Sequence, residues 1–386
     1  MALFILLLLP LFLHFNPTVA TFDITSFGAK SNGQSDSAQP LIQAWEAACS
    51  SSSPSTIYIP TGTFLVSQAR LLGPCKSNKI TVQIDGTLIS RSDYSEFGRK
   101  GDWIVFDHVE GVSVYGGSID GSGGSLWACK ANGHNCPDGA TSLTFSNSND
   151  ILISGLTSVN SELYHIVIDG CQGVTLQGVK ISAPGNSPNT DGIHVQMSTD
   201  VTVRGASIKT GDDCISVGPG TANLWIEQVS CGPGHGISIG SLGKEYQEKG
   251  VRNVTVRTTM FVGTENGLRI KTWGRPSDSF VKGVAFEHSI MQNVQHPIII
   301  DQNYCPDERG CPDQNSGVKI SQVSYNDIQG SSATEIAMSF TCSSSNPCSG
   351  IELQDVKLTY EGKIAASSCK NAIGTASGLV QPPSCL

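Results

Sequence analysis

Short apolar triplets recur along this chain at a nearly constant interval, and this recurrence restricts the fold more than any other feature of the sequence. In each triplet two apolar residues flank a middle residue, the alternation expected of a strand with one buried face. A first series begins at residues 112, 151, 174, 201, 224, 254, 284, 318 and 351, and a second at residues 166, 193, 215, 237, 268, 298 and 336. From residue 151 onward the starts of the first series lie 23 to 34 residues apart, which is typical of solenoid repeats.

Two interleaved strand series with one common repeat length are what a parallel β-helix requires, because each coil lays its strands on those of the preceding coil. The triplets are rich in β-branched residues, Gly and Asn stand at the breaks, and residues 100–360 show no convincing 3.6-residue period. A β-sandwich is the competing all-β architecture, but hairpin connections would not produce this repeat. The sequence therefore predicts an all-β fold, a single-stranded right-handed parallel β-helix.

The ends of such a helix need covering, because open strand edges pair with other chains. Residues 38–48 carry Leu41, Trp45 and Ala48 on one side and follow a Ser-Asp-Ser sequence typical of a helix start. We expect this segment to be a short N-terminal capping helix over the first coil. The cysteine-rich tail after Cys342 is the candidate cover for the other end.

The N-terminus indicates export. Residues 2–13 are almost purely apolar, and the sequence Thr-Val-Ala at residues 18–20 is the small-residue ending after which signal peptidase cleaves. A membrane anchor is the alternative, but the run is shorter than the roughly 20 residues of a span and no later run reaches that length. We expect residues 1–20 to be a signal peptide and residues 21–386 to form a single domain.

Thirteen cysteines fit an oxidising compartment. Five disulfides are predicted from short separations, and a sixth joins Cys49 to Cys75. The five are Cys129 with Cys136, Cys214 with Cys231, Cys305 with Cys311, Cys342 with Cys348, and Cys369 with Cys385. This pairing leaves Cys171 free. Clustered CxxC or Cys/His spacing is absent, which argues against a zinc site.

The overall charge narrows the range of ligands. Lys and Arg number 24 against 33 Asp and Glu, for a net charge of -9. Nucleic-acid-binding proteins normally have a basic surplus, so this class is disfavoured. An anionic ligand would need cations placed locally to hold it. An N-glycosylation sequon begins at Asn253.

Alignment of the second triplet series brings polar residues into one column. Asp191, Asp213, His235 and Asn266 each stand two places before the first apolar residue of four successive triplets. Neighbouring parallel strands lie about 4.8 Å apart, so these side chains should form a line on one face. Asp212 stands beside Asp213 in the same line.

Two cations belong to the same face, because Arg269 and Lys271 flank Ile270 on the outward side of their strand. Backbone-capping turn chemistry accounts for a lone Asp before a strand. It does not account well for three crowded carboxylates, which repel one another. Calcium is another use of grouped carboxylates, but the adjoining cations would repel it. Basic residues beside paired carboxylates suit an anionic substrate better.

Carboxyl groups crowded in this way favour acid/base chemistry. Cleavage of a glycosidic bond needs one protonated carboxyl to donate to the leaving oxygen and one carboxylate to activate water or to attack. Crowded acids supply both states, because ionising one raises the pKa of its neighbours. The column therefore predicts hydrolysis of an acidic polysaccharide, with no metal and no cofactor.

Four motifs follow one another in the chain: Asn189-Thr190-Asp191, Gly211-Asp212-Asp213, Gly234-His235-Gly236 and Arg269-Ile270-Lys271. Together they resemble the signature of the polygalacturonase family of glycoside hydrolases. Residues 26–29, 44–49 and 59–62 extend the resemblance over nearly the whole mature chain. Residues 187–195, 231–244 and 266–276 are most similar to plant members, and more to the endo-acting than to the exo-acting enzymes.

The resemblance implies a role for each acidic residue. Asp212 would be the general acid, and Asp191 with Asp213 would position and deprotonate the water, which gives inversion at the anomeric carbon. His235 would tune Asp212 or hold the hydrogen bonds of the groove. Neighbouring parallel strands lie about 4.8 Å apart. This distance is nearer to the carboxyl separation of retaining enzymes, about 5 Å, than to that of inverting enzymes, about 6.5 to 9.5 Å. Backbone spacing does not fix carboxyl spacing, so the resemblance decides for inversion.

The resemblance also implies a substrate and a location. Arg269 and Lys271 would bind the substrate carboxylate, Asn189 would support the site, and Tyr304 matches the substrate-contacting tyrosine of the family. The substrate would be the α-1,4-linked galacturonan of pectin homogalacturonan, cleaved by a monomeric enzyme secreted to the plant cell wall or apoplast. No nucleic acid and, after signal removal, no membrane would be a partner.

Three other functions remain open from the sequence. One is an exo-acting galacturonan hydrolase, because loops at the groove ends decide between endo and exo action. Another is a calcium-dependent pectin or pectate lyase, which can share a β-helix but is disfavoured by the cations beside the acids. The third is a pectin-binding solenoid without activity, which is disfavoured because all the catalytic-looking residues are present.

Overall fold

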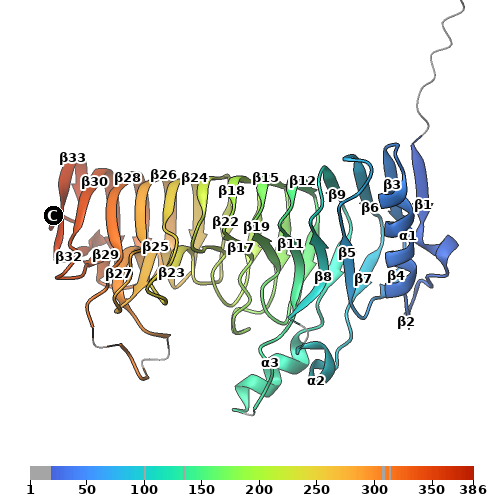
Figure 1. The fold of residues 1–386 in the computed structure, drawn as a ribbon. Helices are drawn as coiled ribbons and strands as arrows, with labels where there is room; N and C mark the ends of the chain where they lie inside the picture. Colours follow the sequence, from blue (N-terminus) through green and yellow to red (C-terminus); the bar gives the residue numbers. More distant parts are fainter. Residues whose placement is uncertain (1–18, 100, 134, 307–308, 313) are drawn as a thin grey trace, which may run out of the picture.

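The structure is a computed structural model that describes residue 19 and all later residues except 100, 134, 307–308 and 313, and its strands stack into an elongated parallel β-helix (Figure 1). Residues 1–18 of the predicted signal peptide lie outside the described residues. The predicted cleavage point after Ala20 falls at the first residue of β1 (Ala20–Asp23). Among the described residues, no helix is long and apolar enough to cross a membrane.

Each complete coil contributes one strand to each of three ladders. Ladder I comprises β5 (Ala69–Leu72), β8 (Asp102–Asp107), β11 (Thr141–Ser146), β14 (Ile166–Asp169), β17 (Ile193–Gln196), β20 (Ile215–Val217), β23 (Ile237–Leu242), β25 (Asn266–Trp273), β27 (His296–Tyr304), β29 (Ile336–Thr341) and β32 (Ala366–Lys370). Ladder II comprises β1, β3 (Ser55–Ile59), β6 (Ile80–Ile84), β9 (Val112–Tyr115), β12 (Asn149–Ser154), β15 (Gln172–Gln177), β18 (Thr199–Arg204), β21 (Ala222–Glu227), β24 (Val251–Val262), β26 (Phe280–Val294), β28 (Lys319–Ser332), β30 (Cys348–Tyr360) and β33 (Ala372–Gln381).

The third ladder was not predicted from the sequence. Ladder III comprises β2 (Asn32–Asp36), β4 (Thr63–Leu65), β7 (Thr87–Ile89), β10 (Ser118–Asp120), β13 (Thr157–Val159), β16 (Lys180–Ser182), β19 (Ser207–Lys209) and β22 (Ser230–Cys231), and continues in the second halves of β24, β26, β28 and β30. Most of its short strands bury a single side chain, such as Ile181 in β16 or Ile208 in β19. A strand with one buried apolar residue has no apolar triplet, so the sequence pattern does not predict ladder III.

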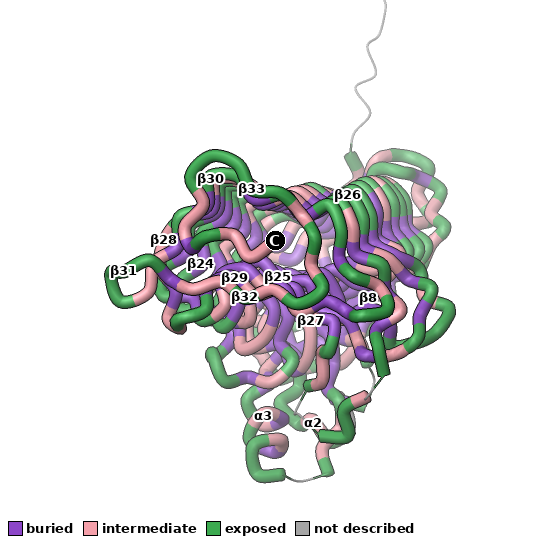
Figure 2. Tube along the Cα trace, turned by 90° about the vertical axis from the view of Figure 1, so that its left-hand side faces the viewer, coloured by how far each residue is buried: buried purple, intermediate pink, exposed green. Residues whose placement is uncertain are grey.

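The inward residues of the triplets stack on one another and form the core. In ladder I the register runs from Ile166 through Ile193, Ile215, Ile237 and Leu268, all fully buried. Burying each such side chain contributes about 1.5 to 3 kcal/mol to stability. The predicted parallel β-helix is therefore confirmed, and in the view from its C-terminal end the buried residues gather inside the stacked coils (Figure 2).

Two predicted triplets were wrong in register. In β28 the residue stacked on Val284 is Val323 rather than Val318, and in β29 the residue stacked on Ile298 is Met338 rather than Ile336. At each of these strands a second pair of apolar residues lies close to the pair that the sequence pattern picked out. Packing against the preceding coil decides which pair is stacked, and Ile336 is left 44% exposed.

The N-terminal end is capped as predicted. Helix α1 (Ala38–Ser50) buries Leu41, Trp45 and Ala48 against the first coil. Its first turn is capped by Asp36, whose Oδ1 accepts from the backbone N–H of Ala38 at 3.0 Å. The Trp45 Nε1–H donates to the carbonyl of Leu72 at 3.0 Å and anchors the helix to β5.

One short helix, α3 (Gly124–Ala131), lies within residues 100–360, where the sequence showed no convincing 3.6-residue period. Helix α3 projects with α2 (Tyr94–Phe97) from the side of ladder I (Figure 1). At eight residues, α3 is too short to show a period, and a disulfide from Cys129 to Cys136 holds its end. The helix η1 (Ile24–Phe27) lies beside α1.

The C-terminal tail folds back over the last coil, as Figure 2 shows, and Cys385 and Leu386 pack on the core there. The disulfide from Cys369 to Cys385 fixes this tail. Strand β31 (Lys363–Ile364) pairs antiparallel with β30 nearby. The tail therefore covers the end of the core opposite α1, as the sequence predicted.

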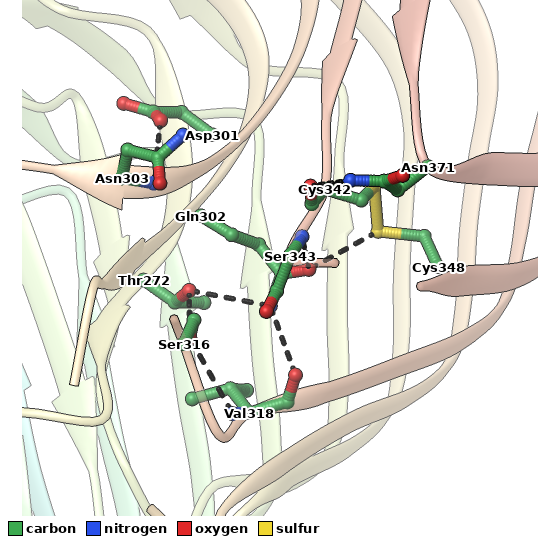
Figure 3. Close-up of a disulfide and its surroundings, with 10 residues drawn as sticks. All are labelled: Thr272, Asp301, Gln302, Asn303, Ser316, Val318, Cys342, Ser343, Cys348 and Asn371. Carbon is green, nitrogen blue, oxygen red and sulfur yellow. Dashed lines mark hydrogen bonds between the residues drawn. A yellow bond between two sulfur atoms is a disulfide. The ribbon is translucent and has the colours of Figure 1, made fainter. Parts of the chain in front are cut away.

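Buried hydrogen bonds around Gln302 of β27 connect the last coils of the β-helix (Figure 3). The Gln302 amide donates to the Val318 carbonyl at 2.9 Å and accepts from the Ser343 N–H at 3.0 Å. The Cys342–Cys348 disulfide lies beside it. All six predicted disulfides are present, and Cys171 is a free, buried thiol.

Candidate active site

The register of ladder I brings the predicted acidic column together. Ile193, Ile215, Ile237 and Leu268 are paired in successive strands, so the residues two places before them follow one another along the helix axis. The backbone continues the ladder through this region, because the Gly192 N–H donates to the Asp213 carbonyl at 2.9 Å. The column therefore lies at the N-terminal edge of ladder I.

Asp213 lies in a clamp of three donors, which we call the Asp213 clamp. Its Oδ1 accepts from Arg269 Nη2 at 2.7 Å and from Ser238 Oγ at 2.7 Å, and its Oδ2 accepts from Lys271 Nζ at 2.8 Å. Burial opposes ionisation, but the charges of Lys271 and Arg269 outweigh it and hold the pKa of Asp213 well below its usual range. Asp213 is therefore a fixed carboxylate.

Both predicted cations are buried on this carboxylate rather than lying open in the groove. The exposed fractions of the Arg269 and Lys271 side chains are only 10% and 8%. Burial would lower their pKa, but the charge of Asp213 raises the pKa of each. Lys271 Nζ also lies 5.1 Å from the ring centre of Tyr304, which places that predicted residue of β27 at the edge of the clamp.

Asp212 faces away from the clamp toward His235. Its Oδ1 contacts His235 Nδ1 at 3.0 Å and accepts from the Asp213 N–H at 2.8 Å. Its Oδ2 accepts from Asn189 Nδ2 at 3.5 Å. Burial would lower the pKa of His235, but the hydrogen bond and charge of Asp212, with the charge of Glu265, raise it. Asp212 and His235 thus form a hydrogen-bonded pair beside the clamp.

The glycines around His235 make this turn possible. A side chain at Gly234 would place its Cβ 2.7 Å from the Asp212 carbonyl, and one at Gly236 would lie 2.2 Å from the Asn266 carbonyl. Both glycines have a positive φ, of 142° and 86°. The Gly-His-Gly motif is therefore a tight turn that places the imidazole of His235 next to Asp212.

Asp191 has the opposite electrostatic environment to Asp213. It is only 6% exposed. Burial and the charges of Asp212 and Asp213 raise its pKa well above the usual range, and the hydrogen bond of Ser216 and the charge of Lys271 oppose this only in part. Two neighbouring positions of the column therefore hold one carboxyl whose pKa is lowered and one whose pKa is raised.

A groove on the outer face of ladder I contains the acids. Its lining begins at Asp102 in β8 and extends past Asp191, Asp212 and Asp213 to Lys271 and Tyr304 in β25 and β27. Eight strands separated by about 4.8 Å make this lining roughly 34 Å long. The groove therefore offers room on both sides of the acids.

One group in the described part of the chain has the composition of a metal site. Carboxylate oxygens of Asp212 and Asp213 and a nitrogen of His235 lie within 4.8 Å of one another. Arg269 and Lys271 already occupy both oxygens of Asp213. Two buried cations beside the group would repel a metal ion, so the donor set does not suit one.

Sequence reasoning missed the middle residues of the ladder I triplets. His194, Ser216 and Ser238 are paired across β17, β20 and β23 and line or support the groove. Tyr164 stacks on the His194 ring with centroids 5.1 Å apart. The signal was available, because the middle residue of every inward-facing triplet points outward, and Arg269 was recognised in that way.

Comparisons with known proteins agree with this arrangement. The model of glycosyl hydrolases family 28 matches residues 49–378. A polygalacturonase of Prunus persica is 58% identical over 367 residues, 95% of this chain and 93% of that protein. An exopolygalacturonase of Platanus acerifolia is 42% identical over 369 residues, 94% of this chain and 97% of that protein.

A solved structure shares the fold. The endo-xylogalacturonan hydrolase from Aspergillus tubingensis superimposes with a TM-score of 0.78 and 22% identity over 93% of this chain and all of that one. The resemblance drawn from the four motifs and the prediction of a right-handed parallel β-helix are both confirmed. The chain is a hydrolase, and it belongs to the glycosyl hydrolases of family 28.

Proposed function

We propose that this chain hydrolyses the α-1,4-galacturonosidic linkages of pectin homogalacturonan by an inverting acid/base mechanism. The observation that carries the proposal is the presence of Asp191, Asp212 and Asp213 in one groove, with Asp213 held by Arg269 and Lys271. The pKa of Asp213 is lowered by these cations, and the pKa of Asp191 is raised by burial. Relatives named polygalacturonase and exopolygalacturonase support the substrate class.

Asp212 is the proposed general acid. Its Oδ1 is occupied by His235 and by the Asp213 N–H, so Oδ2 is the oxygen that carries the proton toward the glycosidic oxygen. The side chain is 18% exposed, against 1% for Asp213, and so it is the more accessible of the two to a bound polysaccharide. His235 holds the carboxyl in place, and Asn189 supports Oδ2.

Asp191 and Asp213 divide the activation of water in this proposal. The Asp213 clamp keeps one carboxylate ionised throughout the reaction, where it orients the water and stabilises the positive charge that develops on the sugar ring. Asp191 has the higher proton affinity, so it accepts the proton from the attacking water. Asp191 acts in its ionised form in this proposal, and its raised pKa makes that carboxylate the stronger base of the two.

Arg269, Lys271 and Tyr304 form the proposed contact with the substrate carboxylate. Lys271 has three donor hydrogens and Arg269 five, and their bonds to Asp213 and Ser238 leave donors for an anionic sugar. Tyr304 stands at the groove edge beside Lys271. These residues supply the local cations that a chain of net charge -9 needs for an acidic polymer.

We favour endo action, because the groove lining extends on both sides of the acids. We also propose that residues 1–20 are removed as a signal peptide and that residues 21–386 are the catalytic domain, working as a monomer in the plant cell wall or apoplast. The six disulfides and the plant origin of the relatives support this location.

Incubation with a defined galacturonate oligomer tests the function and the mode of action together. Endo hydrolysis yields a ladder of saturated oligomers with new reducing ends, and exo hydrolysis yields monomer alone. An unsaturated product that absorbs in the ultraviolet, lost on adding a chelator, would identify a lyase instead. Binding without new reducing ends would identify an inactive pectin-binding protein.

A further inference from the structure

Two cations just beyond the ends of ladder I strands have no role in the acid/base steps proposed above. Lys244 follows β23 and lines the groove, and Arg275 follows β25. Neither forms an ion pair with a carboxylate of the described residues. Arg269 and Lys271 differ from them, because both are bound to Asp213. The charges of Lys244 and Arg275 are therefore free for a ligand.

A hollow next to the groove brings these two cations together. Its lining consists of Lys244, Tyr246, Arg275, Pro276, Pro312 and Gln314. Lys244 also lines the groove, so the hollow adjoins the groove where β23 ends. Tyr246 is 66% exposed, and its ring offers an apolar face to the C–H side of a sugar. The hollow thus combines two positive charges with an accessible aromatic ring.

Hydrogen bonds fix the turn at residues 243–250, which carries Lys244 and Tyr246. Both oxygens of Glu248 accept from backbone N–H groups of this turn, one of them that of Lys244. The Tyr246 carbonyl accepts from the Asp278 N–H at 2.9 Å, and the Lys244 carbonyl accepts from Arg275 Nη1 at 3.4 Å. The turn is therefore held against the segment after β25 without any ligand.

A series of rings and cations connects the hollow to the Asp213 clamp. The guanidinium carbon of Arg275 lies 5.3 Å from the ring centre of Trp273. Trp273 meets the ring of Tyr304 edge to face at 5.5 Å and 77°. Lys271 Nζ lies 5.1 Å from the Tyr304 ring centre on the other side of this series. Two rings therefore stand between Arg275 and Lys271, and each cation has its own position along a bound chain.

The hollow lies across the groove from the acids. Asp191 and Asp213 precede β17 and β20, at the N-terminal edge of ladder I, whereas Lys244 and Arg275 follow β23 and β25 at the opposite edge. A polysaccharide in the groove passes between these two edges. Galacturonan carries a carboxylate on every sugar, so sugars other than the one at the clamp also present a negative charge to the groove walls.

We propose that Lys244, Tyr246 and Arg275 form a second binding site for a galacturonate residue, different from the residue held at Arg269 and Lys271. Lys244 and Arg275 bind its carboxylate, and Tyr246 packs against its ring. The proposal rests on the galacturonan hydrolysis proposed above and assigns a further contact to the same substrate. Affinity should therefore rise once an oligomer is long enough to reach both sites.

Binding measured against oligomer length tests the proposal. The ligands are galacturonate oligomers from the dimer to the octamer, titrated by calorimetry into Asp212→Asn enzyme, which should not consume them. In that background, Arg275→Gln and Lys244→Gln should each weaken octamer binding about 10-fold, as expected for a charge-assisted hydrogen bond. Neither should change the binding of the shortest oligomer that binds. Arg275→Lys retains the charge and should retain most of the affinity.

The matched control is Lys249→Gln in the same background. Lys249 is an exposed cation of the same turn that lines neither the groove nor the hollow, so its replacement should leave octamer binding unchanged. Equal losses for short and long oligomers in Arg275→Gln would mean that Arg275 acts through Trp273 on Tyr304, and would overturn the proposal. An equal loss in Lys249→Gln, or unchanged octamer binding in both variants of the hollow, would overturn it as well.

Methyl-esterified octamers test the role of the sugar carboxylate. Their binding should be the same with and without Arg275→Gln, and a loss as large as that for the free acid would refute a carboxylate contact. These titrations do not depend on turnover. If the unmodified enzyme released no reducing ends from galacturonan, the proposed function would fail, while length-dependent losses at Lys244 and Arg275 would still establish the second site.

Discussion

Replacing Asp191 by Asn should stabilise the fold at neutral pH, and the same replacement at Asp213 should destabilise it. Asp191 is buried and its pKa is raised by burial and by two neighbouring carboxylates. A carboxyl with a raised pKa contributes stability that is complete below its unfolded pKa of about 3.9 and is lost as the pH rises through the folded pKa. The amide has no charge to lose, so Asp191→Asn avoids that cost.

Asp213 contributes in the opposite direction. Its folded pKa is depressed, so its stabilising effect is present above a pH of about 3.9 and is lost as the pH falls toward the folded pKa. Asp213→Asn leaves Arg269 and Lys271 buried without their counter-charge. Removing one partner of a buried ion pair costs about 3 to 5 kcal/mol.

The expected shifts in melting temperature follow from these values. Relieving the raised pKa of Asp191 increases the free energy of unfolding at neutral pH, so the melting temperature of Asp191→Asn should lie above that of the unmodified protein. A chain of about 370 residues has an unfolding entropy near 0.8 kcal/mol/K, so each 1 kcal/mol changes the melting temperature by about 1 °C. The loss at Asp213 converts to about -4 to -6 °C.

Differential scanning calorimetry of the three proteins between pH 3 and pH 7 measures both effects. Neither variant should hydrolyse galacturonan, so the stability difference does not follow from activity. The difference in melting temperature between each variant and the unmodified protein should shrink toward pH 3. At that pH Asp191 is protonated, and the stabilisation that comes from the lowered pKa of Asp213 is partly lost. Changes in melting temperature of the same sign for both variants at pH 7 would refute the opposite pKa shifts of Asp191 and Asp213.

Three further predictions follow from the site. Asp212→Asn should lower kcat about 100-fold to 10,000-fold with unchanged circular dichroism, because it removes the proton donor; near-normal turnover would exclude Asp212 as the acid. In the Asp212→Asn background, Lys271→Met should weaken the binding of galacturonate oligomers, measured by calorimetry, about 10-fold or more while affecting fully methyl-esterified oligomers less; equal losses would assign Lys271 wholly to holding Asp213. Cys214→Ser/Cys231→Ser removes a bridge closing 17 residues beside Asp213, worth roughly 3 kcal/mol in the chain-entropy account, and should lower the melting temperature and reduce activity below it; full activity in the folded double variant would limit the bridge to stability.

Period-two patterning was sufficient to predict most strands of ladder I from β14 and of ladder II from β9, because burial on one face imposes this pattern on a strand with two inward residues. The strands before these and the last strands, β32 and β33, were not predicted. The pattern was also sufficient for the acidic column, because parallel register carries an alignment from one strand to the next. It failed for ladder III, where strands such as β16 bury one side chain each. It also failed at Val318 and Ile336, where neighbouring coils select among competing apolar pairs.

The site was predicted by position but not by contact. The sequence places Arg269 and Lys271 outward, yet it does not show that Asp213 reaches both, because that depends on how the turn before β20 directs its side chains. The role of Ser238 was likewise hidden. A serine carries no signal of its own, and only the structure shows that its hydroxyl donates to Asp213.

Proton NMR of the first product released from a galacturonan oligomer tests the central claim most directly. In this account Asp212 donates a proton to the leaving glycosidic oxygen. Water activated by Asp191 and Asp213 attacks the anomeric carbon from the opposite face of the sugar, which inverts that carbon. The account predicts that the new reducing end appears first as the β anomer and only later equilibrates with the α anomer. Initial release of the α anomer would mean retention through a covalent intermediate and would contradict the proposed roles of the three aspartates.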